Sequence, residues 1–220
     1  MSETLYSQVV GLSAGLLLLT AVLIVWRRSL RAQVRLLAVQ GAALAGLAAA
    51  LGVHERHAEL VAVALLVLTL KGAFLPVALT RALGAEGGTA REETPLINTT
   101  TSLISLSLLT MLAFLVSRPL LVLGDGAAIA AVPVGVSLVL YGFVVLATRR
   151  HAISQLIGFL VLDNGIATVA FLTAGGVPLV VELGVSLDVL LVVLILQVLT
   201  SRIRTQFGVT DLDDLRELHD

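Results

Sequence analysis

Long apolar segments separated by short polar ones dominate the chain as far as residue 201. Seven of these segments are about 20 residues long, the length that an α-helix needs to cross a hydrocarbon core about 30 Å thick. We therefore predict an all-α, polytopic membrane protein with seven transmembrane helices. The predicted helices cover residues 5–26, 34–53, 58–79, 101–123, 127–148, 152–174 and 178–201.

The arginines predict the orientation of these helices, because Lys and Arg in short loops accumulate on the cytoplasmic side of a membrane. With seven helices, only Arg56 and Arg118 fall in loops of one face. We therefore expect the amino terminus outside and the carboxyl terminus in the cytoplasm. The opposite face carries Arg27, Arg28, Arg31, Arg35, Arg81, Arg91, Arg149, Arg150, Arg202, Arg204 and Arg216.

A short internal similarity suggests a duplicated three-helix unit. An Arg-Arg pair followed five residues later by glutamine occurs twice, at Arg28 and Gln33 and again at Arg150 and Gln155. Parallel repeats are common in membrane transport proteins. We therefore divide the chain into a first unit, a glycine-rich cytoplasmic linker, a connector helix, a second unit and a cytoplasmic tail, at residues 1–83, 84–100, 101–126, 127–203 and 204–220.

The composition supports a membrane location and limits the chemistry. Apolar residues make up 58% of the chain and charged residues 13%, and the mean hydropathy is +1.04, far from the values of a soluble domain. The net charge of −1 gives no reason to expect nucleic-acid binding. A chain without cysteine cannot hold an iron–sulfur cluster through thiolates. We expect no catalytic residues, no metal ligands and no cofactor in this chain.

Three ionisable residues lie near the middle of predicted helices: Lys71, Asp163 and Asp188. A charge at the centre of a bilayer costs about 2.5–3.5 kcal/mol even on the lenient insertion scale, and such residues commonly mark ion or proton pathways. Lys71, Asp163 and Asp188 are therefore the candidate proton-transfer residues, at similar depths. A buried pair that only fixes helix register is the alternative, and the sequence does not show which aspartate Lys71 reaches.

Two further polar residues are secondary candidates. Asn164 follows Asp163 on a different face of the same helix, where it contacts a partner helix or simply packs. Glu182 lies one turn into the seventh predicted helix, where its carboxylate can complement the helix N-terminus or reach the membrane surface.

The stretch RRHAISQLIGFLVLDNGIATVAF resembles the K subunit of respiratory complex I and the C subunit of multisubunit cation/proton antiporters. Those proteins carry a basic pair, an Ile-Gly pair, an acidic residue and an asparagine along the matching helix, and Asp188 matches the central carboxylate of their next helix. The chain departs from the pattern at Leu160, which holds the place of the first carboxylate. Asp163 lies one turn later.

The seven-helix length, LKGAFLP and LDNGI together resemble the hydrogenase-4 component E family, whose members are membrane subunits of formate hydrogenlyase-type and other complex I-like assemblies. The resemblance implies a multi-pass subunit of the cell membrane, with Lys71, Asp163 and Asp188 in a hydrophilic axis. It also implies antiporter-like membrane partners and soluble hydrogenase-type redox partners, which would hold the Ni-Fe and iron–sulfur centres.

We therefore predict a membrane subunit of a membrane-bound hydrogenase or related oxidoreductase, contributing to proton translocation or redox coupling. A cation/proton antiporter subunit and a purely structural assembly subunit are the alternatives.

Overall fold

The computed structural model describes residues 1–85, 98–122, 126–149 and 152–173, and this part of the chain contains helices and no strand. The predicted helix at 178–201, with Asp188 and Glu182, lies outside the described residues, as do most of the linker and the tail. The helices are α1 (Glu3–Trp26), α2 (Leu30–Glu55), α3 (Ala58–Val67), the π-helix η1 (Leu68–Phe74), α4 (Leu75–Ala85), α5 (Thr99–Val116), α6 (Arg118–Leu121), α7 (Ala127–Thr148) and α8 (Ala152–Thr173).

Six of the predicted membrane spans are present as helices long and apolar enough to cross a bilayer. One of them, Ala58–Arg81, joins α3, η1 and most of α4, and another, Thr100–Leu120, joins α5 and α6. The protein is therefore a helical membrane protein.

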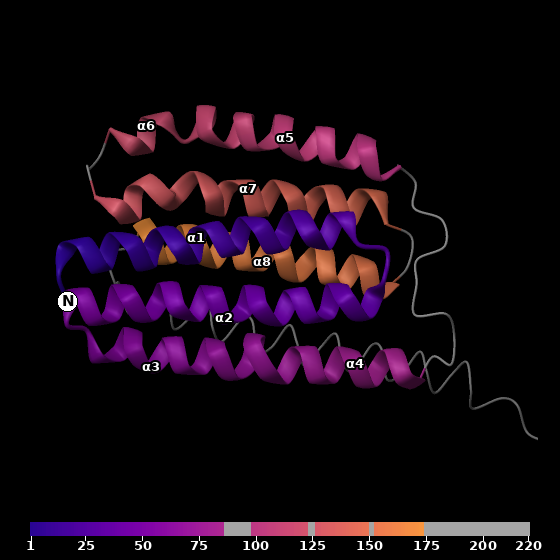
Figure 1. Ribbon diagram of the computed structural model, residues 1–220, viewed down its shortest axis with the longest axis horizontal. Coiled ribbons are helices and arrows are strands. Elements are labelled where there is room, and N and C mark those ends of the chain that lie inside the picture. Colours follow the sequence, from indigo (N-terminus) through magenta and orange to yellow (C-terminus); the bar gives the residue numbers. More distant parts are fainter. Residues whose placement is uncertain (86–97, 123–125, 150–151, 174–220) are drawn as a thin grey trace, which may run out of the picture.

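The helices run side by side with their long axes nearly parallel (Figure 1). Helices α1, α2, α7 and α8 form the centre of the bundle, where α1 packs on both α2 and α7, and α2 also packs on α8. The segment from α3 to α4 packs on the outer side of α2, and α5 packs on α7 and α1. The bundle therefore places α2 between the π-helix and the hairpin of α7 and α8.

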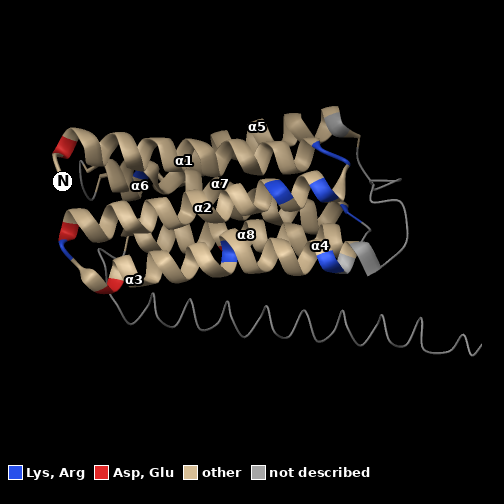
Figure 2. Ribbon diagram, turned by 60° about the horizontal axis from the view of Figure 1, so that its bottom comes forward, with Lys and Arg blue, Asp and Glu red and all other residues tan. Residues whose placement is uncertain are grey.

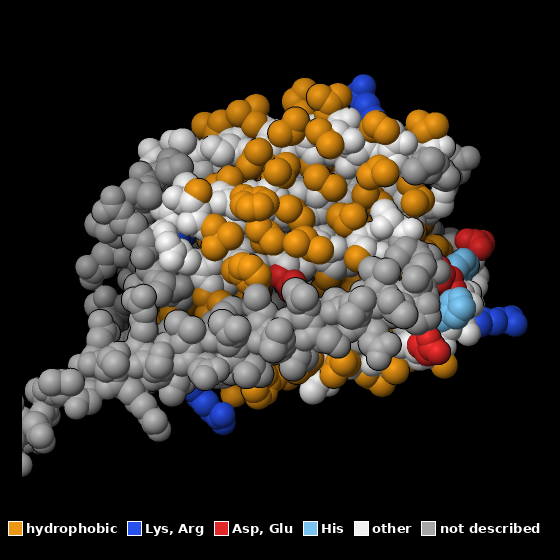
Figure 3. Space-filling model, turned by 180° about the vertical axis from the view of Figure 1, so that it is seen from behind, with side chains coloured by type: hydrophobic (Ala, Val, Ile, Leu, Met, Phe, Trp, Pro, Cys, Tyr) orange, Lys and Arg blue, Asp and Glu red, His pale blue; other side chains and the backbone are white. Residues whose placement is uncertain are grey.

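Most charged residues of the described part lie at the two ends of the bundle (Figure 2). The exceptions are Lys71 and Asp163, which lie near its middle. Arg31 and Arg35 of α2 and Arg81 of α4 lie toward one end. Glu3, Glu55 and Glu59 lie at the other. The surface between the ends is mainly hydrophobic on the face seen from behind (Figure 3). This distribution suits helices that cross a hydrocarbon layer.

Two predicted helix boundaries were wrong for identifiable reasons. Helix α2 begins at Leu30 rather than residue 34, because the Ser29 hydroxyl accepts a hydrogen bond from the backbone N–H of Ala32 and caps an earlier first turn. The fourth span is interrupted at Ser117, since Pro119 lacks the backbone N–H needed to continue α5. Arg31 thus lies in a helix, whereas the predicted boundary placed it in a loop.

Glycines hold α7 and α8 unusually close. A Cβ atom added to Gly165 would lie 2.6 Å from the backbone nitrogen of Val139, and one added to Gly158 would lie 2.6 Å from Cγ1 of Val145. Small residues let transmembrane helices approach closely enough for backbone packing. The close approach fixes α8, and with it Asp163 and Asn164, relative to the rest of the bundle.

Candidate functional site

The π-helix η1 carries Lys71 and ends just before Pro76. A proline in a helix cannot donate its backbone bond, and its ring collides with the carbonyl four residues earlier. Here the N–H of Leu75 donates to the carbonyl of Leu70, five residues back, which widens the turn ahead of the proline. Single wide turns of this kind are rare and occur frequently at functional sites. The change from π-helix to α-helix therefore lies between Lys71 and Pro76.

Gly41 allows this wide turn to lie directly against α2. A Cβ atom added to Gly41 would lie 2.6 Å from both the carbonyl carbon and the carbonyl oxygen of Lys71, and 2.9 Å from the nitrogen of Gly72. Any larger residue at position 41 would have to push η1 outward. The absence of a side chain at Gly41 thus determines how closely the backbone at Lys71 approaches α2.

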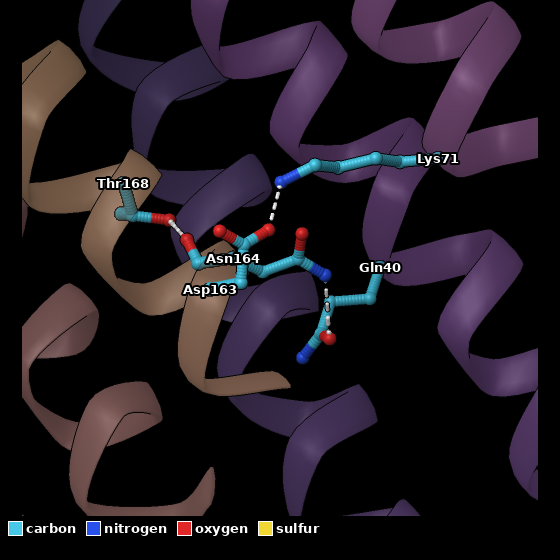
Figure 4. Close-up of polar contacts among 5 residues, drawn as sticks. All are labelled: Gln40, Lys71, Asp163, Asn164 and Thr168. Atoms are coloured by element: carbon cyan, nitrogen blue, oxygen red, sulfur yellow. Dashed lines mark hydrogen bonds and ion pairs between the residues drawn. The ribbon is translucent and has the colours of Figure 1, made fainter. Parts of the chain in front are cut away.

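The structure brings Lys71 and Asp163 together across the bundle. The Lys71 ammonium Nζ lies 2.5 Å from Oδ2 of Asp163 and donates a hydrogen bond to it (Figure 4). The two side chains keep only 6% and 19% of their surface exposed. A charge-assisted hydrogen bond of this kind is roughly twice as strong as one between neutral groups, and breaking a buried ion pair is strongly destabilising.

The pair lies near the middle of the membrane spans. Asp163 is the central residue of the span Ile153–Thr173, and Lys71 lies about ten residues, or about 15 Å, from the arginine-rich end of Ala58–Arg81. Gln40 lies at a similar distance from the arginine-rich end of α2. Lys71 and Asp163 thus lie at similar distances along their spans from the arginine-rich end.

Beside the ion pair, two side-chain amides form a separate set of hydrogen bonds inside the bundle. Nδ2 of Asn164 donates to Oε1 of Gln40 at 3.0 Å, and Nε2 of Gln40 donates to the backbone carbonyl of Leu17 at 3.3 Å (Figure 4 shows the first contact). Both amide residues are buried, and Thr168 closes the next turn of α8 by donating to the carbonyl of Asn164 at 2.7 Å. We call Asn164, Gln40 and Leu17 the amide chain.

The amide chain joins Asn164, which the sequence analysis selected, to Gln40, which it did not select. Asn164 makes a hydrogen bond to a partner helix, one of the two roles that the sequence left open. Gln40 was not selected, although it is the only strongly polar residue between Arg35 and His54 of α2. A lone glutamine in the middle of an apolar span was the signal that could have identified it.

The two hairpins that contain Arg-Arg pairs close in the same way. Nε2 of Gln33 donates to the carbonyl of Arg27 at 2.7 Å, and Nε2 of Gln155 donates to the carbonyl of Arg149 at 3.0 Å. The Arg149 side chain is itself buried, and its Nη2 donates to the carbonyl of Val25 at 2.7 Å. These bonds tie the α1–α2 and α7–α8 connections together at the arginine-rich end.

His54, near the end of α2, contacts two side chains of α1. The ring of His54 stacks on that of Tyr6 with centroids 3.9 Å apart, and its Nε2 lies 3.5 Å from Oε1 of Glu3. Among the residues that the structure describes, no three His, Asp or Glu side chains gather closely enough to hold a metal ion.

Replacing Gly41 with alanine is expected to destabilise the protein by about 1–3 kcal/mol, the usual cost of overpacking. The physical reason is the contact of the new Cβ with the backbone of η1. Thermal unfolding of the purified chain in lipid nanodiscs measures the effect. Gly15→Ala is the matched control, because nothing lies within 4 Å of its added Cβ and alanine favours a helix by up to about 1 kcal/mol. Equal behaviour of both variants would contradict the assigned contact.

Comparisons with known proteins give two relationships. The chain is 52% identical over 220 residues to the uncharacterized protein Rv0085 of Mycobacterium tuberculosis, with all of both chains covered. It is 24% identical over 212 residues to hydrogenase-4 component E of Escherichia coli, covering 96% of this chain and 98% of that protein. The second similarity indicates a distant relation. No established family profile matches the chain, and no solved structure matches it.

Proposed function

We propose that this chain, which belongs to the same protein family as Rv0085 of Mycobacterium tuberculosis, is a membrane subunit of a membrane-bound hydrogenase or related complex I-like oxidoreductase. Its full-length, distant similarity to hydrogenase-4 component E supports membership of a multisubunit membrane complex. Its proposed task is to contribute intramembrane charges to proton translocation or redox coupling.

The observation that carries this proposal is the ion pair of Lys71 and Asp163 near the middle of the membrane spans. A carboxylate can take up and release a proton, so a buried aspartate is able to act as one step of a proton path. Because Asp163 keeps part of its surface exposed, whereas Lys71 is buried, the aspartate is the member of the pair that exchanges protons with neighbouring groups.

The finer features of the proposal come from the sequence. We propose that Asp188 in the seventh predicted helix extends the path, with Glu182 nearer the membrane surface. The arginine-rich end of the bundle would face the cytoplasm in the cell membrane, with the amino terminus outside. The matching bonds of Gln33 and Gln155 support a duplicated unit in which the α1–α2 and α7–α8 hairpins correspond.

The partners follow from the same proposal. Antiporter-like membrane subunits would continue the proton path, and soluble hydrogenase-type subunits would hold the Ni-Fe and iron–sulfur centres that a chain without cysteine cannot bind through thiolates. The present chain would then supply the connection between redox chemistry and proton movement.

Isolation of the native complex tests this function. A tag on the chain, extraction in mild detergent and metal analysis should recover antiporter-like membrane subunits together with a large subunit containing nickel and iron. The Glu59→Gln chain serves as the control, because this exposed carboxylate lies near the end of its span and its replacement should leave the set of partners unchanged. Recovery of antiporter-like subunits without any redox subunit would contradict the hydrogenase proposal and favour an antiporter.

A further inference from the structure

Exposed arginines lie toward one end of the bundle, where the described residues include no acidic side chain (Figure 2). The carboxylates of the described part lie elsewhere: Glu3, Glu55 and Glu59 belong to the opposite end, and Asp163 is paired with Lys71. Like charges repel one another unless an anion lies among them. This end therefore favours an anion that the described residues do not supply. Its exposed arginines are Arg27, Arg28, Arg31, Arg35 and Arg81.

Two of these arginines, Arg31 and Arg35, belong to the membrane span α2. Gly41 of this helix packs against the backbone of Lys71, near the middle of the spans. Arg35 precedes Gly41 by six residues and Arg31 by ten, so their Cα atoms lie about 9 and about 15 Å from that level. Half of a hydrocarbon core is about 15 Å thick. Arg31 is therefore at the hydrocarbon boundary, whereas Arg35 starts inside it and extends its stem toward the boundary.

The two arginines share a face of α2 with small apolar residues. The row on this face consists of Arg31, Arg35, Ala38 and Ala42. Successive spacings of four, three and four residues place these positions on one side of a helix. All of them are exposed except Ala38, which is half-buried. A groove of about 230 Å³, lined by Ala, Gly, Val and Leu residues, begins at Ala42 and lies between α2 and the segment of α3 and η1. The row therefore leads from two cations to an apolar groove.

A phospholipid presents its groups in the same order as this row. Its phosphate lies at the edge of the hydrocarbon core, and its acyl chains extend about 15 Å to the centre of the bilayer. Ala42 follows Arg31 by eleven residues, or about 16 Å along α2. An acyl chain that starts beside Arg31 therefore ends where the groove begins. The small side chain of Ala38 leaves room for it on the way.

We propose that Arg31 and Arg35 bind the phosphate of an anionic phospholipid, with one acyl chain lying along Ala38 and ending at the groove beside Ala42. In the proposed orientation the lipid belongs to the cytoplasmic leaflet. A guanidinium group binds phosphate oxygens through two parallel hydrogen bonds, so two arginines on one face can hold one headgroup together. A zwitterionic headgroup carries its own cation, which the arginines repel, so a headgroup with net negative charge is favoured.

The depth of Arg35 favours a lipid over an acidic surface of a soluble protein. Its Cα lies about 6 Å inside the hydrocarbon boundary, a distance that an arginine stem spans to reach a lipid phosphate. A soluble subunit stays on the water side of the headgroups, where Arg27 and Arg28 of the connection between α1 and α2 are the nearer cations. The two pairs of arginines therefore separate a lipid site from general attraction of negative charge.

Thermal unfolding of the purified full-length chain tests the site. Nanodiscs of phosphatidylcholine alone are compared with nanodiscs that also contain phosphatidylglycerol. The anionic lipid should raise the unfolding midpoint of the wild type by about 2 °C or more, because it binds the folded chain. Replacing both site residues, with Arg31→Gln and Arg35→Gln together, should abolish most of this increase.

The matched control is Arg27→Gln with Arg28→Gln. It removes the same charge from the same end, but at exposed positions outside α2. This control should keep the increase caused by phosphatidylglycerol. Equal loss in the two double variants would indicate a diffuse attraction and overturn the site. No increase for the wild type would also overturn it, and would favour an acidic protein surface as the partner of the arginines.

Native mass spectrometry of the chain in detergent measures lipid binding directly. The wild type should retain phosphatidylglycerol in preference to phosphatidylcholine, and Arg31→Gln with Arg35→Gln should weaken this retention about tenfold or more. The control pair should retain the lipid as the wild type does. Equal retention of the two lipids by the wild type would overturn the proposal.

Discussion

Proton movement by the assembled complex is expected to fall about 100-fold or more when Asp163 is replaced by asparagine, within the range that positioned acid–base groups contribute. Asparagine has nearly the same shape as the aspartate and keeps an oxygen that can accept from Lys71, but it cannot take up a proton. The expected loss therefore reports proton exchange at this position. A pH-sensitive dye enclosed in proteoliposomes measures the proton flux while the redox reaction is driven from outside.

The matched control for this experiment is Glu59→Gln. Glu59 is an exposed carboxylate in the first turn of α3, in the same span as Lys71 but near its end. Its replacement should leave the proton flux unchanged. Full flux through an Asp163→Asn complex with all its subunits present would remove Asp163 from the path and favour a structural role for the ion pair.

Loss of the Lys71 ammonium alone should be costly for stability. Lys71→Met leaves the Asp163 carboxylate buried without its cation, and breaking a buried pair in this way typically costs about 3–5 kcal/mol. Removing both charges, with Lys71→Met and Asp163→Leu together, should cost less than either single change, because no uncompensated charge then remains. Thermal unfolding in nanodiscs measures all three variants.

Arg81→Met is the control for the second experiment, since Arg81 is an exposed cation further along the same span. Its replacement should change the free energy of unfolding by no more than about 0.5 kcal/mol. If the double variant lost as much stability as the two single variants added together, the two side chains would not be energetically coupled, and the contact of Lys71 with Asp163 would carry no stability.

The six membrane spans of the described residues were predictable because hydropathy and segment length reflect the transfer of a whole helix into lipid, a property of the local sequence. The break at Ser117 could also have been expected, since Pro119 is visible in the sequence. The early start of α2 was harder to predict, because hydropathy places the boundary where the apolar run begins, whereas the Ser29 cap starts the helix in the polar residues before it. Errors of this kind shift a boundary by a few residues without changing the architecture.

The candidate site was less accessible from the sequence, because hydropathy does not specify which helix faces which. Lys71 and Asp163 were recognisable as buried charges, but their contact depends on packing between segments 92 residues apart. The role of Gln40 depends on its position between Leu17 and Asn164, which only the assembled bundle provides. The wide turn at Lys71 likewise depends on how close Gly41 lets the backbone approach.

The π-helix has a consequence for how this site could be gained or lost over time. Each residue of an α-helix turns the chain by about 100°. A single deletion within η1 would therefore restore an ordinary α-helix only by rotating the part of the span before the deletion by about 100° relative to the part after it. Lys71 would then point away from Asp163 although every residue of the pair were still present. A relative in which this helix is one residue shorter should therefore lack the ion pair, whatever its overall identity to this chain.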